Sequence, residues 1–210
     1  MYNVPHFKAH DYKEVRAFMH ANPFVILCGC DANNSPVATH VPVLIEERDE
    51  KIFLKAHVMR KQKHTAAFEH NQNVLAIFSG SHTYVSASWY ETKEIASTWN
   101  YQAVHAKGIL HWKDENFLRA LLTGLTQKFE NNPHSPSLVT KMTEEYVSNM
   151  MKAIIAFEIE ITSIEHVFKL SQNRDEKSYE NIIEHLNNGN EDAKVVAAAM
   201  KGNQHNVFKK

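Results

Sequence analysis

The chain has 210 residues, of which 43% are apolar and 22% charged, and its formal net charge at pH 7 is −1. These proportions are typical of one globular domain with a sizeable core and exclude an intrinsically disordered chain. The near-zero charge also excludes a molecule-wide attraction to nucleic acid, so that any DNA binding would need a local basic patch.

The N-terminal half begins with a short predicted helix, followed by several strands. Asp11 and Glu14 have the spacing of a helix capping box, and Pro23 limits the helix that they begin. A basic segment, residues 60–69, is predicted to be helical between two of the strands. The predicted strands of this half are residues 24–28, 37–45, 51–58 and 73–78, the first two forming a hairpin.

The C-terminal half alternates extended and helical segments. Two extended stretches, the second broken near Gly108, come first, and a strand with one apolar face begins at Ile155. The predicted extended stretches are residues 82–87, 98–112, 155–162 and 164–170. The predicted helices are residues 114–129 and 143–152, with two more between 175 and 200.

Six to eight strands joined mostly by short turns indicate an α+β protein built on a closed or nearly closed antiparallel β-barrel with peripheral helices. This order of elements fits a doubly wound sheet less well. No stretch is long and apolar enough for a membrane span, and no basic segment followed by an apolar run begins the sequence. We therefore expect a cytoplasmic protein with no membrane partner.

Several standard sites are missing from the sequence. It contains no glycine-rich phosphate loop, no zinc motif and no nucleophile elbow, so we assign no catalytic residue and no metal ligand. The 14 histidines could bind metal, although scattered surface histidines are the commoner cause of such a count. Cys28 and Cys30 point the same way along a strand and lie too close in sequence for an ordinary disulfide, which favours a reducing compartment.

A basic segment, residues 55–64, lies where a strand ends and a helix begins, and it includes Arg60 and Lys61. Cations at a helix N-terminus interact unfavourably with the helix dipole. A bound phosphate would make the arrangement favourable, because both the backbone amides and the cations could hold it. The segment therefore indicates either a phosphate site or a solvated basic turn.

Three other segments combine aromatic and polar side chains. Residues 84–90 and 98–105 suit a flat heteroaromatic ligand, or they simply fill a core or a dimer interface. Residues 168–174 end a strand with clustered polar groups, which could contact an anion or form a plain turn.

These segments resemble the PaiB-like family of FMN-binding negative transcriptional regulators. The resemblance includes Ala38-Thr39-His40-Val41-Pro42, Thr98-Trp99-Asn100-Tyr101 and Phe168-Lys169-Leu170-Ser171-Gln172-Asn173-Arg174 and extends in order over nearly the whole chain. It implies an FMN-binding split barrel, with FMN held between the subunits of a homodimer. We expect a flavin-binding domain over residues 1–170 and a helical extension, residues 171–210, packed on it.

The resemblance also implies site residues. We expect Arg60 and Lys61 near the phosphate, with Lys169 or Arg174 as second contacts, and Thr39 and His40 along the flavin edge. Aromatic and amide side chains are expected to shape the ring pocket or the subunit seam, with His105 a weaker candidate; these are Trp89, Trp99, Asn100 and Tyr101.

Three functions remain open at this point. The first is a regulator that uses flavin as a signal, with DNA as its partner, although no helix-turn-helix is recognisable in the sequence. The second is a flavin-dependent oxidoreductase of unknown substrate, in which the flavin carries the chemistry. The third is a haem-binding split barrel, which the histidine content favours.

Overall fold

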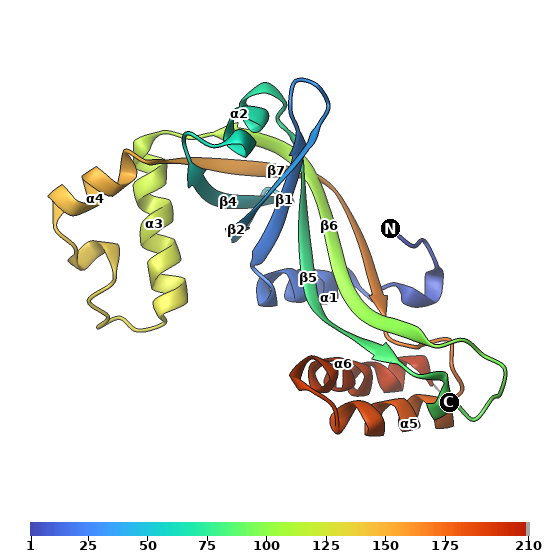
Figure 1. Cartoon of the computed structure of the whole chain (residues 1–210). Helices are drawn as coiled ribbons and strands as arrows, with labels where there is room; N and C mark the ends of the chain where they lie inside the picture. Colours follow the sequence, from blue (N-terminus) through green and yellow to red (C-terminus); the bar gives the residue numbers. More distant parts are fainter. Residues whose placement is uncertain (209–210) are drawn as a thin grey trace. The chain divides into compact units, whose positions relative to one another are not determined.

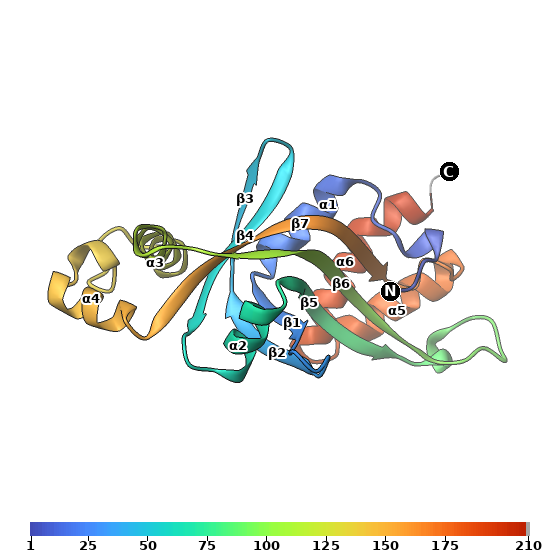
Figure 2. The same cartoon turned by 90° about the horizontal axis from the view of Figure 1, so that it is seen from above.

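The computed structural model describes residues 1–208 and contains seven strands and six α-helices within that range (Figures 1 and 2). The strands are β1 (Phe24–Cys30), β2 (Pro36–Pro42), β3 (Leu44–Arg48), β4 (Lys51–Met59), β5 (Asn73–Val85), β6 (Thr98–Trp112) and β7 (Ile154–Lys169). The helices are α1 (Tyr12–Ala21), α2 (Lys63–His70), α3 (Glu115–Glu130), α4 (Glu144–Met151), α5 (Glu176–Asn187) and α6 (Glu191–Val207). Within the described range, no helix combines the length and the apolar character that crossing a bilayer requires.

The seven strands form one sheet in the order β2-β1-β5-β6-β7-β4-β3. β1 pairs antiparallel with both β2 and β5, and β4 pairs antiparallel with both β3 and β7. The two edge strands of this order, β2 and β3, are consecutive in the chain and separated by Val43 alone. A sheet whose two edges are joined by one residue must curl on itself, which gives the split barrel.

The chain divides into two compact units. Unit 1 comprises Met1–Asn22, Ser79–His105 and Glu165–Lys210, and unit 2 comprises Pro23–Phe78 and Ala106–Ile164. The boundary expected at residue 170 stays a prediction. In this division the C-terminal helices share a unit with the N-terminal segment and with residues 79–105. Residues 209 and 210 of the expected extension lie outside the described residues.

Unit 2 contains the barrel core. Alternate residues of β1 and β4 point inward, and Val25, Leu27, Leu54 and Ala56 are fully buried. A second apolar cluster joins α3 and α4 through Leu118, Leu121, Leu125, Val147, Met151 and Ala156. Asp114 caps α3 by accepting a hydrogen bond from the Phe117 amide at 2.8 Å, as the predicted helix start requires.

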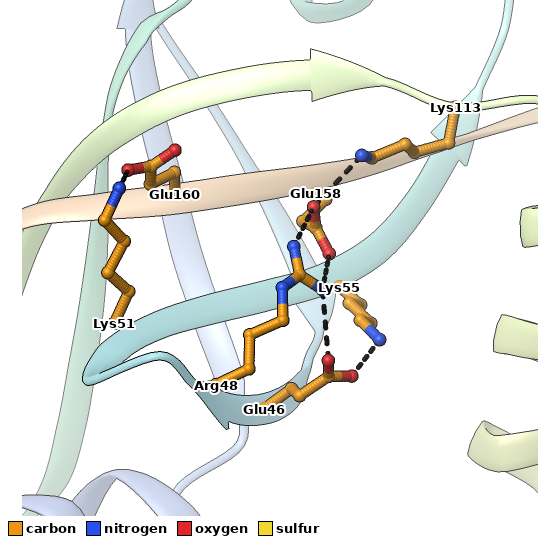
Figure 3. A network of polar contacts seen from close by, with 7 residues as sticks. All are labelled: Glu46, Arg48, Lys51, Lys55, Lys113, Glu158 and Glu160. Carbon is orange, nitrogen blue, oxygen red and sulfur yellow. Dashed lines mark hydrogen bonds and ion pairs between the residues drawn. The ribbon is translucent and has the colours of Figure 1, made fainter.

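Unit 2 also contains a network of ion pairs on β3, β4 and β7 and on Lys113, the residue that follows β6, as Figure 3 shows. At its centre the Glu158 carboxylate, 3% exposed, accepts from both terminal nitrogens of Arg48 at 2.9 and 3.2 Å and pairs with Lys113 at 3.0 Å. Arg48 also covers the Phe53 ring, with its guanidinium carbon 3.7 Å from the centroid. The buried charge is therefore compensated by one cation on β3 and one directly after β6.

Unit 1 has its own core, built largely on the two C-terminal helices. α5 and α6 are joined by three residues and lie side by side as a helical hairpin (Figure 1). The buried Tyr179 hydroxyl donates to the Met200 carbonyl at 2.8 Å, which ties the two helices together. The buried side chains of this core are Val85, Tyr90, Leu170, Tyr179, Ile182, Leu186, Ala193, Val196, Ala197 and Met200.

Several strand boundaries differ from the sequence-based expectation, and the stretches expected at residues 155–162 and 164–170 form the single strand β7. The single run predicted over residues 37–45 is two strands, because the chain passes at Val43 from one edge of the sheet to the other. The gap expected between the extended stretches 73–78 and 82–87 is part of β5. A Cβ at Gly80, within that gap, would lie 2.9 Å from the Phe18 ring, so the absence of a side chain there leaves room for the ring. The break expected near Gly108 is absent, because a Cβ there would lie 2.4 Å from the Glu160 carbonyl oxygen and the glycine instead permits close strand packing.

Candidate functional site

Unit 2 carries a cavity of ≈ 380 Å³ beside strand β2. β2 and β4 supply most of its lining, and the start of α2 closes one end. The lining residues are Thr39, His40, Val41, Pro42, His57, Val58, Met59, Gln62, His64 and Ile154. Cavities of this size accommodate small molecules and cofactors.

The turn that connects β4 to α2 is basic and exposed. Arg60 and Lys61 occupy it, and Lys63 is the first residue of the helix. The turn is fixed at both ends, since the Arg60 amide donates to the Ala153 carbonyl at 2.9 Å and the Thr65 hydroxyl to the Met59 carbonyl at 2.7 Å. Its side chains are therefore free to contact a ligand while its backbone is held.

The N-terminus of α2 lacks a side-chain cap. Gln62 occupies the cap position without a capping hydrogen bond, and the first helical turn contains no acidic residue. Unpaired amides and the helix dipole attract an anion at such an end, and neighbouring cations add to that attraction. Arg60, Lys61 and Lys63 form no ion pair with another described residue within 4.0 Å. The end of α2 is thus suited to a phosphate group.

Imidazole groups line the cavity next to this basic turn. Burial lowers the pKa of His57 and of His64, so both rings are neutral at physiological pH. The Nδ1 atom of His57 is buried and lacks a hydrogen-bond partner, while the exposed His40 ring stacks on Phe24 at 5.9 Å between centroids. A buried polar atom without a partner is uncommon, and a bound ligand with polar edges would satisfy it. No set of three ligating side chains suited to a metal ion occurs among residues 1–208.

The structure brings four of the expected site residues together in unit 2. Thr39 and His40 line the cavity, and Arg60 and Lys61 directly follow its lining residue Met59. His57, Gln62 and His64 are lining residues that sequence reasoning did not name individually. The sequence indicated them only through their position in the basic segment, residues 55–64. The strand face on which His57 lies became clear only from the pairing of β4 with β7.

The other six expected residues lie in unit 1, and three of them are aromatic. Trp99 is 53% exposed and lies near Tyr84 on the neighbouring strand, with 6.0 Å between ring centroids. Trp89 stacks on His185 at 4.7 Å with an interplanar angle of 10°. Tyr101 is half-buried, and burial followed by the influence of Tyr2 raises its pKa. Trp99 is therefore the most accessible of the three.

The three polar residues of this set make internal contacts. Asn100 is fully buried, where it donates to the Met200 sulfur at 3.4 Å and accepts from the Ser171 hydroxyl at 3.0 Å. Lys169 donates to Thr98, and burial, followed by the charge of Arg174, lowers its pKa. The Arg174 guanidinium lies 4.7 Å from the Tyr90 ring centroid, and its buried Nε has no hydrogen-bond partner. His105 is half-buried on β6.

The barrel with its cavity belongs to a known class. A family described as "Putative FMN-binding domain" matches residues 1–163, and the chain belongs to this family. It is 34% identical over 202 residues to "Protease synthase and sporulation protein PAI 2" of Bacillus subtilis (strain 168), an alignment that covers 96% of this chain and 97% of that protein. The resemblance found in the sequence is thus confirmed.

Solved structures share the fold at low sequence identity. One is a "putative 5-nitroimidazole antibiotic resistance protein" from Bacteroides thetaiotaomicron, with a TM-score of 0.55, 12% identity, and coverage of 75% of this chain and 84% of that chain. Another is an "FAD and Heme binding protein" from Mycobacterium smegmatis, with a TM-score of 0.54, 13% identity, and coverage of 77% and 72%. They confirm the expected split-barrel fold.

Proposed function

We propose that the chain binds FMN in the unit 2 cavity. The observation that supports this proposal most strongly is the uncapped N-terminus of α2. It is flanked by Arg60, Lys61 and Lys63 and lies beside a cavity of ≈ 380 Å³. In this proposal the phosphate binds at the helix end and at Arg60 and Lys61, while Thr39, His40 and His57 contact the flavin. The family description and the unpartnered Nδ1 of His57 support this assignment.

The expected site residues of unit 1 enter the proposal as contacts at a subunit seam. Trp99 and Tyr84 are 53% and 49% exposed, which is unusual for two large aromatic side chains in contact. Exposed aromatic groups of this kind favour a homodimer interface. Trp89, Asn100, Tyr101, Lys169 and Arg174 stay predictions of this site.

The biological role we propose is that of a PaiB-type negative transcriptional regulator whose ligand is FMN. The relative from Bacillus subtilis supports it, since it is named for protease synthesis and sporulation and aligns over 97% of its length. The α5–α6 hairpin is a poor DNA-binding element, because Glu176, Glu180, Glu184, Glu191 and Asp192 outnumber its three lysines. Flavin also supplies redox chemistry when bound, so an oxidoreductase of unknown substrate is the alternative.

The phosphate assignment is tested by titrating the protein with FMN and with riboflavin, which lacks the phosphate. We expect Arg60→Ala and Lys61→Ala each to weaken FMN binding by about 1–3 kcal/mol, the value of a charged hydrogen bond, and to leave riboflavin affinity unchanged. Lys152→Ala, which removes an exposed cation that donates to Asn149, is the matched control. Equal effects of the substitutions on both ligands would remove Arg60 and Lys61 from the phosphate site.

A second cofactor, haem, is favoured by one observation, the three imidazole side chains that line the same cavity. Haem titration followed at the Soret band distinguishes the two cofactors. A band that disappears in His57→Ala or His64→Ala, together with a failure to bind FMN, would favour haem.

The regulator proposal is tested by the binding of the FMN-loaded protein to promoter DNA and to scrambled DNA of equal length. A regulator that contacts DNA binds the promoter preferentially and more weakly as salt rises. Equal binding to both DNAs would leave the oxidoreductase alternative, which NAD(P)H oxidation assays with the loaded protein can examine.

A further inference from the structure

Cys28 and Cys30 lie on one face of strand β1. Strand residues alternate between faces, and the inward positions Val25 and Leu27, which precede the cysteines on β1, are fully buried in the barrel core. The two cysteines therefore lie on the outer face, where both are half-buried and both are free thiols.

Both thiols line one cavity of ≈ 520 Å³ in unit 2, separate from the proposed flavin site. Its other lining residues come from β1, from the loop end of β2 and from β5, β6 and β7, and none of them lines the cavity beside α2. They are Gly29, Pro36, Asn73, Val74, Leu75, Lys107, Gly108 and Thr162. This arrangement gives an open, mostly apolar hollow whose soft donor atoms are the two thiols.

The spacing of the pair favours a bridging ion over a disulfide. Residues two apart on a strand have Cα atoms about 6.6 Å from one another, with side chains projecting in parallel. Disulfides span roughly 4.4–6.8 Å between Cα atoms, most often about 5.5–6 Å, so this separation lies at the upper end of the range, and disulfides also require side chains that converge. An ion bound between the two sulfur atoms replaces the single S–S bond of a disulfide with two metal–sulfur bonds. The connection between the cysteines is then longer, which suits the wider spacing.

The number of donors selects the ion. No group of three or more ligating side chains capable of holding a metal is found among residues 1–208, so the pair must act alone. Zn²⁺ requires four ligands in structural sites, whereas thiolates select soft ions such as Cu(I), which is stable with two thiolates in linear coordination.

We propose that Cys28 and Cys30 form a two-thiolate binding site for Cu(I) on the outer face of the barrel. On binding, each S–H bond breaks, two protons pass to solvent, and two Cu–S bonds form without electron transfer. The resulting bis-thiolate complex carries one negative charge, and Lys107 contributes a positive charge to the wall of the same cavity.

The test uses the full-length reduced protein under anaerobic conditions. Cu(I) is titrated in competition with a chromophoric chelator, and Ag(I), which is not oxidised, serves as a second probe. We expect one ion per chain, two sulfur neighbours by X-ray absorption, and tighter binding as pH rises, because two protons leave.

Variants make the proposal falsifiable. Cys28→Ser and Cys30→Ser should each abolish competition with the chelator, whereas Met150→Leu, which removes an exposed thioether on α4, should not. Thermal unfolding and FMN titration of both serine variants serve as folding controls, and unchanged FMN binding keeps this test independent of the proposed function.

Three results would overturn the proposal. The first is undiminished Cu(I) binding by the double serine variant, and the second is retention of full affinity by either single variant. The third is ready formation of a Cys28–Cys30 disulfide under mild oxidation, detected by mass, since this would contradict the spacing argument.

Discussion

At Glu158 two influences on the pKa oppose one another. Burial raises the pKa of the carboxyl group, while the hydrogen bonds and charges of Arg48 and Lys113 lower it, and the net shift is downward from 4.5. A carboxylate with a depressed pKa stabilises the fold above the pKa of the unfolded chain. That stability is lost as pH falls below about 4.5 and through the folded pKa.

We therefore expect Glu158→Gln to lower the free energy of unfolding by about 2 kcal/mol. This loss is smaller than that expected for a fully buried ion pair, because Arg48 and Lys113 are partly exposed. Urea unfolding at neutral and at acid pH measures this, and the variant should lose less stability on acidification than the parent. Glu160→Gln, which removes a more exposed pair with Lys51, should change stability much less than Glu158→Gln does. Similar losses in both variants would contradict the central role of Glu158.

The histidines beside the cavity add a second pH dependence at residue scale. Burial lowers the pKa of His57 below 6.5, so the folded protein takes up fewer protons than the unfolded chain as pH falls. The stability associated with neutral His57 is therefore present above pH 6.5 and declines below it. We expect His57→Gln to flatten the stability profile in that window, measured without FMN. His134→Gln, in an exposed loop, is the control. If the slope of stability against pH is as unchanged in His57→Gln as in this control, His57 is excluded as a source of the pH dependence.

Two glycines allow a matched test at the scale of elements. A Cβ at Gly108 on β6 would lie 2.4 Å from the Glu160 carbonyl oxygen of β7, whereas nothing lies within 4 Å of a Cβ at Gly202 on α6. We expect Gly108→Ala to destabilise by about 1–3 kcal/mol through overpacking. Gly202→Ala should stabilise by about 0.5–1 kcal/mol through helix propensity. Denaturant midpoints measure both changes. If Gly108→Ala left the free energy of unfolding unchanged, β6 and β7 could move apart at this point without loss of stability.

Local elements were predictable because their determinants are local. Asp11 accepts a hydrogen bond from the Glu14 amide at 2.9 Å, as the capping box predicts, and α3 begins at the expected position. Strand ends were less predictable, since Gly80 and Gly108 look like breaks until Phe18 and Glu160 are placed beside them. Of the site, the basic turn was visible in sequence, but the cavity between β2 and β4 depends on long-range pairing such as that of Leu54 with Ile159.

At the scale of the whole molecule, the proposed self-association into a homodimer can be measured directly. Trp99 and Tyr84 present exposed aromatic surface in unit 1, in keeping with the proposed homodimer. We expect Trp99→Ala to shift the sedimentation profile from dimer toward monomer at equal concentration. Tyr146→Ala, which removes a 55% exposed aromatic residue from α4, is the control. A parent protein that sediments as a monomer with FMN bound would exclude the homodimer.

The single-residue step at Val43 leaves the outer edges of β2 and β3 as an open seam in the sheet. Unpaired strand edges invite edge-to-edge aggregation, and natural sheets protect them with proline, charge and short length. β2 begins and ends with proline, which offers no amide to a foreign strand, and the five-residue β3 carries Glu46, Glu47 and Arg48. The sequence of these two strands thus discourages the addition of another strand at either edge of the sheet.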